Sequence, residues 1–114
     1  MKTSSKKAKG HALEKLIRAR IIEAFNLDEE DVRIPVGSET GADIKLNSRA
    51  KRLCPFQFEA KNHEKFLTIY SYYEQAVNHK DGLVPCLVIK MNRRQPLAIL
   101  DLDHLLTLVA NNKE

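Results

Sequence analysis

The sequence lacks several features that would assign it to common protein classes. No hydrophobic run approaches the roughly 20 residues that a membrane-spanning helix needs. The basic N-terminus has no apolar stretch of the kind found in secretion signals. There is no internal repeat and, beyond residues 1–9, no low-complexity segment. We therefore expect a cytoplasmic protein that has no membrane partner.

Cysteine and histidine are too few and too scattered to form a disulfide framework or a zinc site. Cys54 and Cys86 lie far apart and form no CxxC pair, so we expect two free thiols in a reducing cytosol. The four histidines include no HxxxH pair, which argues against zinc.

The length and hydrophobic content fit one globular domain. The chain has 114 residues, of which 43% are hydrophobic, so a real core is expected. A chain this short leaves much of its surface exposed, and dimerisation would bury more of it. We expect residues 1–9 to form a flexible basic arm and residues 10–114 to form a single domain.

Positive charge is concentrated in three parts of the sequence. The net charge is +4, yet residues 1–20 alone hold seven basic residues against one acidic residue. Further clusters occupy residues 45–52 and 90–94. Such clusters suit phosphate backbones, although a solvated surface explains them equally well. The candidate DNA-contacting residues are Lys6, Lys7, Lys9, Arg18, Arg49, Lys51, Arg52, Arg93 and Arg94.

The hydrophobic periodicity predicts an α/β fold in the order α-β-β-β-α-β-β-α. A helix between two apolar strands implies a right-handed crossover and an α/β sheet. The apolar run over residues 84–91 predicts a strand covered on both faces. The predicted helices cover residues 11–25, 64–78 and 101–109. The other predicted strands cover residues 32–36, 42–46, 54–61 and 97–100. A loop is predicted over residues 37–41 and a basic turn over residues 47–52.

The segment that carries chemistry runs from residue 38 to residue 61. Asp43 lies on one short strand, and Glu59 and Lys61 lie two residues apart on the next, so they share a face. If the two strands pair, Asp43 lies beside Glu59, and two close carboxylates repel unless a cation joins them. A hard divalent ion such as Mg²⁺ takes these oxygen ligands and bridges to phosphate. A surface ion pair between Glu59 and Lys61 is the simpler alternative.

Several segments together resemble a known family. They read GHALEKL, GSETGADI, PFQFEAKNHE, YYEQA and VPCLVIKMNRRQPLAIL, followed by LDLDHLL. With them the chain resembles the PD-(D/E)xK nuclease superfamily, and within it the Holliday-junction-resolvase-like endonucleases of phage and archaeal type. The resemblance implies a restriction-endonuclease-like core, in which helices flank a mixed central β-sheet. It also implies a homodimer, Mg²⁺-dependent cutting of branched DNA in recombination or repair, and a bacterial or phage-infected host cell. Mn²⁺ is expected to substitute, and no small-molecule substrate is expected.

The resemblance also implies roles for individual residues. Asp43, Glu59 and the Ala60 carbonyl would bind the metal, with Glu14 of the first helix supporting it, and Lys61 would be the catalytic lysine. The proline that often precedes the aspartate is replaced by Ala42.

Other positions keep two interpretations. Ser38 or Thr40 corresponds to a loop hydroxyl, and Gln75 to a glutamine near the site, although Gln75 also fits an ordinary exposed helix position. Glu14 also fits an i, i+4 partner of Arg18. The tyrosines near Gln75 would either stack on bases or belong to the core or a dimer interface.

The expected function is a structure-selective DNA endonuclease that resolves four-way junctions. A flap, fork or single-strand nuclease of the same fold is one alternative, and a DNA-binding module with a vestigial site is another.

Overall fold

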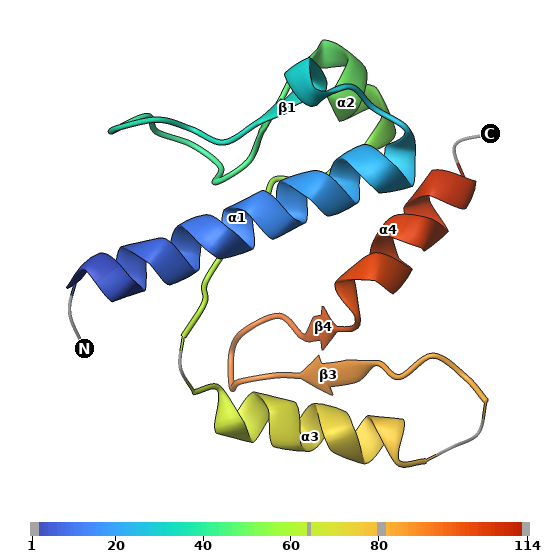
Figure 1. Cartoon of the computed structure of the whole chain (residues 1–114). Helices are drawn as coiled ribbons and strands as arrows, with labels where there is room; N and C mark the ends of the chain where they lie inside the picture. The colour runs from blue at the N-terminus through green and yellow to red at the C-terminus, as the bar shows by residue number, and fades with distance from the viewer. Residues whose placement is uncertain (1–2, 64, 80–81, 113–114) are drawn as a thin grey trace. The chain divides into compact units, whose positions relative to one another are not determined.

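A computed structural model describes residues 3–63, 65–79 and 82–112 (Figure 1). The protein is a mixed α/β chain that divides into two compact units, Met1–His63 with Leu106–Glu114, and Glu64–Leu105. The elements are α1 (Thr3–Phe25), the 3-10 helix η1 (Glu29–Asp31), β1 (Val32–Arg33), β2 (Lys45–Leu46), α2 (Ser48–Leu53), α3 (Leu67–Val77), β3 (Leu87–Ile89), β4 (Leu97–Ile99) and α4 (Leu102–Asn111).

The C-terminal half of α1 supplies much of the core of the first unit. Ile17, Ile21 and Phe25 recur at four-residue spacing and are buried, Ile21 completely. The helix ends because Asn26 adopts a left-handed φ of 53°, and the Leu27 amide then donates to the Ile22 carbonyl at 3.0 Å, as in a Schellman motif.

At its other end, α1 begins earlier than the sequence predicted. It starts at Thr3 instead of near residue 11, so residues 3–9, which we expected to form an arm, are helical. Alanine and lysine are good helix formers, and the prediction, which was based on the polar and lysine-rich composition, did not use this propensity. The side chains of Lys6, Lys7 and Lys9 lie outside the part of the chain that the structure describes.

Arg18 joins α1 to the segment that follows it. Its Nε donates to the Val32 carbonyl at 2.6 Å and its Nη2 to the Glu29 carbonyl at 2.7 Å. These charge-assisted bonds satisfy carbonyls of η1 and β1. Arg18, which was predicted to contact DNA, therefore has a structural role in this unit.

β1 and β2 form a short antiparallel pair, with Val32 opposite Leu46. Both strands are shorter than predicted. Pro35 follows soon after β1 and has no amide hydrogen to donate to a ladder. Val32 and Ile44 are nevertheless buried, together with Cys54 and Leu106.

The basic segment after β2 is a helix, and the predicted turn is wrong. Asn47 caps α2 by accepting the Ala50 amide at 2.9 Å, and Ala50 is fully buried. Asparagine is a preferred N-cap residue and good helix formers follow it, so the sequence contained this signal.

Residues 54–61 are extended and show the predicted alternation of burial. Cys54, Phe56, Phe58 and Ala60 are buried or half-buried, and the residues between them are exposed. Phe56 and Phe58 pack edge to face, with ring centroids 6.0 Å apart. This segment belongs to no β-ladder within the described residues.

The second unit contains α3 and the β3–β4 hairpin, in which Val88 lies opposite Ala98. The strand predicted to be covered on both faces is exposed on one, because Val88 retains 64% of its surface. A single mixed sheet was also predicted. The described residues instead form two separate two-stranded antiparallel sheets.

α4 begins with a side-chain cap, because Asp101 accepts the His104 amide at 3.1 Å. None of the helices in the described part of the chain combines the length and hydrophobicity that a bilayer crossing requires.

We expect Ile21→Ala to lower the free energy of unfolding by about 2–5 kcal/mol, because it leaves a cavity in the core of the first unit. Leu16→Ala is the matched control on the same helix, since Leu16 is 43% exposed, and it should change the value by only about 0.5 kcal/mol. Urea denaturation measures both. Equal losses for the two variants would contradict this description of the core.

Candidate functional site

Asp43 is held against the extended segment that carries Glu59. Its amide donates to the Phe58 carbonyl at 2.9 Å, and its carboxylate Oδ2 accepts the Ala60 amide at 2.7 Å. The two bonds flank Glu59 on one edge of the segment, because alternate backbone groups of an extended chain face the same side. The backbone and the carboxylate of Asp43 therefore contact both neighbours of Glu59.

Glu59 and Lys61 lie on the same exposed face, as their two-residue spacing predicted. Lys61 Nζ is 3.2 Å from Glu59 Oε2, and each side chain is 65% exposed. A pair this exposed contributes only about 0–1 kcal/mol. A phosphate or a cation that binds here would therefore break the ion pair at little cost in free energy. An ordinary surface ion pair has the same geometry.

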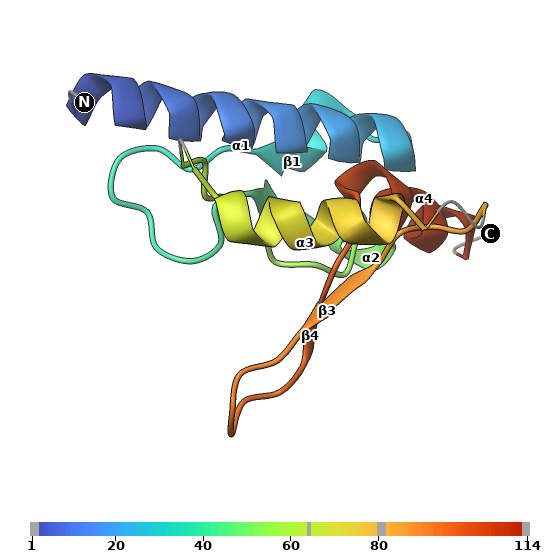
Figure 2. The same ribbon diagram turned by 90° about the horizontal axis from the view of Figure 1, so that it is seen from below.

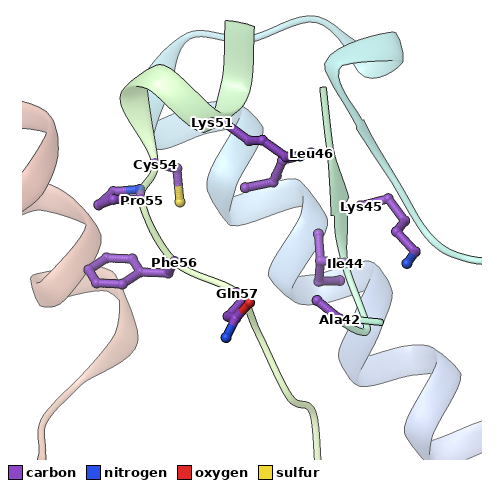
Figure 3. Close-up of a pocket in the computed structure, with 9 residues that line it drawn as sticks. All are labelled: Ala42, Ile44, Lys45, Leu46, Lys51, Cys54, Pro55, Phe56 and Gln57. Atoms are coloured by element: carbon purple, nitrogen blue, oxygen red, sulfur yellow. The ribbon is translucent and has the colours of Figure 1, made fainter. Parts of the chain in front are cut away.

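Two open hollows adjoin these residues. The smaller, of about 340 Å³, is lined by Gly41, Ala42, Gln57, Phe58 and Glu59. The larger, of about 690 Å³, shares Ala42 and Gln57 with it. Figure 3 shows Ile44 and Leu46 on one side of the larger hollow, and Cys54 to Gln57 on the facing segment. Lys51 of α2 lines it too.

An ion pair shapes the loop that precedes Asp43. The Arg33 guanidinium donates to both carboxylate oxygens of Glu39, at 2.8 and 2.9 Å, and the Val36 amide donates to Glu39 Oε1 at 2.8 Å. The hydrogen bonds from Arg33, and then the one from the Val36 amide, lower the pKa of Glu39 to about 2. We call this Arg33–Glu39 ion pair the clamp. It ties the loop to Arg33 of β1 at Glu39, which lies between the exposed residues Ser38 and Thr40.

Gly41 is required at the end of this loop. It has a φ of +98°, which residues with a Cβ rarely adopt, and an added Cβ would lie 2.7 Å from Lys45 Nζ. That amino group donates to the Thr40 carbonyl. Lys45, which belongs to a basic cluster in the sequence, thus closes the turn that leads to Asp43.

The buried carboxylate of Asp31, in the same unit as Asp43, accepts a second set of hydrogen bonds. Asp31 Oδ1 accepts the Asn47 side-chain amide at 2.7 Å, and its Oδ2 accepts the Asp28 amide at 2.8 Å and Arg49 Nη1 at 3.0 Å. The Asp28 amide and the Asn47 side chain lower the pKa of Asp31. Arg49 was predicted to contact DNA, and here it pairs with this carboxylate. The sequence signalled neither this network nor the Arg33 clamp.

The remaining predicted residues are more dispersed. The Glu14 side chain lies 3.7 Å from His11 Nδ1 and is 25% exposed, and its predicted partner Arg18 bonds to carbonyls instead. Gln75 is exposed on α3, in the second unit, so its relation to Asp43 stays a prediction. Arg52 is exposed on α2, and Arg93 and Arg94 are exposed in the turn after β3.

The donor set at Asp43 suits a hard cation. Two carboxylates and a backbone carbonyl offer only oxygen, and Mg²⁺ typically uses one or two carboxylates while it keeps several waters. Within the described ranges, no three His, Cys, Asp or Glu side chains are gathered closely enough to form a protein-only cage. The carboxylate oxygens of Asp43 and Glu59 are donors of the kind that Mg²⁺ prefers.

No protein-family model, curated protein or solved structure was found to match this chain.

At pH values above the ordinary pKa of glutamate, near 4.5, ionised Glu39 should stabilise the loop. This contribution should be lost as the pH falls toward the lowered pKa of Glu39, about 2. We expect Arg33→Gln to move the Glu39 pKa up toward 4.5, because the guanidinium that favours the carboxylate is gone. Carboxyl-carbon NMR titration measures the change. Arg52→Gln, an equivalent change on α2, is the control. A Glu39 titration that is insensitive to Arg33→Gln would exclude the clamp.

Proposed function

We propose that this chain is a Mg²⁺-dependent, structure-selective DNA endonuclease of the PD-(D/E)xK type, with a restriction-endonuclease-like core, that resolves four-way junctions. The observation that carries the proposal is the contact of Asp43 with both neighbours of Glu59, at 2.9 and 2.7 Å. That contact joins the two parts of a D…ExK pattern that are 16 residues apart in the sequence.

Asp43, Glu59 and the Ala60 carbonyl would hold the cation, with Mn²⁺ able to replace Mg²⁺. When bound, the cation supplies Lewis acidity toward the phosphate oxygens. The Ala60 amide orients the Asp43 carboxylate, and this bond keeps the carboxylate beside Glu59 before any cation arrives. Preorganisation of this kind lowers the cost of assembling a site.

Lys61 would serve the reacting phosphate. Its ammonium group is held on the Glu59 face by a weak, exposed ion pair, so it can exchange Glu59 for a phosphate oxygen. There it would compensate negative charge and orient a water molecule for attack. Ser38 or Thr40 would supply a hydroxyl from the clamped loop, and Glu14 would support the metal.

Two further features of the proposal concern the substrate. Basic side chains on α2 and in the β3–β4 turn suit phosphate contacts that position DNA without reading its sequence. Symmetric cutting of a four-way junction needs two active sites related by a two-fold axis, which a homodimer supplies.

We expect Glu59→Gln to lower the cleavage rate of a synthetic four-way junction at least about 100-fold, because it removes a charged ligand from the site. A chelator should abolish cutting by the wild type. Glu30→Gln is the matched control, since Glu30 is exposed on η1, and it should cut at the wild-type rate. Flap, duplex and single-strand DNA are assayed in parallel.

Paired, symmetric nicks confined to the junction would support a junction resolvase. Preferred cutting of flaps or single strands would retain the chemistry and change the substrate. Binding of DNA without cleavage in either Mg²⁺ or Mn²⁺ would contradict the enzyme and leave a DNA-binding protein with a vestigial site.

A further inference from the structure

The β3–β4 hairpin combines a basic turn with a complete lack of acidic residues. Residues 82–100 include Lys90, Arg93 and Arg94 but no aspartate or glutamate. Every residue from 90 to 98 is exposed. Figure 2 shows the turn of this two-stranded ribbon extending away from α3, with which it shares a unit. The hairpin therefore presents uncompensated positive charge at its end.

The apex of the turn is conformationally strained. The Arg94 amide donates to the Met91 carbonyl at 3.0 Å and closes a four-residue turn. Its third position is Arg93, with a φ of 66°. This is the left-handed region that glycine occupies without cost and that large side chains rarely adopt. Folding alone favours glycine here, so an arginine at this point indicates a use for its side chain.

A hollow lies beside the apex and has a mixed lining. It has a volume of about 470 Å³, and its lining includes the apolar side chains of Ile89, Met91 and Leu97 together with Lys90 and Arg94. Met91 is 64% exposed and Leu97 is 61% exposed. Apolar side chains with cations next to them match deoxyribose, whose apolar ring is flanked by phosphates on both sides.

We infer that the β3–β4 hairpin is a DNA-binding ribbon whose Arg93 enters the minor groove of a duplex arm. The minor groove is walled by sugars and has a negative potential that attracts arginine. Proteins that bind it combine basic side chains with exposed apolar ones, as Met91 and Leu97 are combined with Arg93 here. The inference rests on DNA being the partner in the proposed function, but it does not require cleavage.

An anionic membrane would also attract the hairpin, but the order of residues favours DNA. The four residues at the tip, Asn92 to Gln95, are all polar. Segments that enter a bilayer place apolar side chains at their deepest point. Here the apolar side chains lie behind the charged apex, as they would against groove walls.

The strain at Arg93 permits a test in which loss of binding is separated from loss of folding. Arg93→Gly should raise the melting temperature, because glycine adopts this φ freely. It should also lower the affinity for duplex and junction DNA about tenfold and reduce the salt dependence of binding. Fluorescence anisotropy with chelator present measures binding alone. Lys65→Ala, which removes one exposed charge from the same unit outside the hairpin, is the control and should bind nearly as the wild type does.

The minor groove is tested with netropsin, a ligand of A·T-rich minor grooves, which should displace the wild type from A·T-rich duplex DNA. Unchanged affinity of Arg93→Gly, or insensitivity of the wild type to netropsin, would overturn the inference. Binding to anionic vesicles but not to DNA would also overturn it. DNA binding that depends on Arg93, without cleavage of any substrate, would contradict only the proposed nuclease activity. Cleavage by the wild type, together with equal DNA affinities of Arg93→Gly and the wild type, would contradict only this inference.

Discussion

The buried carboxylate of Asp31 is the interaction on which the first unit depends. With 5% of its surface exposed, it accepts hydrogen bonds from the Asp28 amide, the Asn47 side chain and Arg49. Its own carbonyl accepts the Asn47 amide at 3.0 Å. A buried charge is tolerated only when it is satisfied in this way. Asn47 also caps α2, so the Asp31 network determines where the chain leaves β2 and where residues 54–61 begin. The position of residues 54–61 in turn determines whether Asp43 can reach Ala60.

The sequence predicted the local patterns better than their assembly. The alternation over residues 54–61 and the apolar face of α1 follow from side-chain periodicity, and the structure has both. Asp43 was expected beside Glu59 through a pair of strands. The described residues do not form that pair, and Asp43 instead bonds to Phe58 and Ala60. The Asp31 network and the Arg33–Glu39 clamp join residues whose spacing carries no periodic signal, so they were missed. The α2 helix was missed for another reason. Its basic residues were interpreted by their charge, although Asn47 followed by helix formers predicts a capped helix.

The two units differ in how much they bury. All of the buried residues in the described part of the chain lie in the first unit. In the second, Leu67, Tyr70 and Leu83 retain 70%, 62% and 81% of their surface. A two-stranded hairpin with one helix is marginal without further cover. This apolar surface is therefore the part of the chain that would gain most from the proposed homodimer, and the tyrosines of α3 fit an interface better than an internal core.

The hydrogen bond between the Ala60 amide and Asp43 Oδ2 also bears on ion selectivity. One oxygen of the carboxylate is already engaged, so Oδ1 is the atom that a cation would approach. Ca²⁺ accepts six to eight ligands and often takes both oxygens of one carboxylate, whereas Mg²⁺ demands octahedral geometry from single oxygens. In the proposed site, a carboxylate that already accepts the Ala60 amide through Oδ2 would favour coordination of the cation through the single oxygen Oδ1, which suits Mg²⁺ better than Ca²⁺.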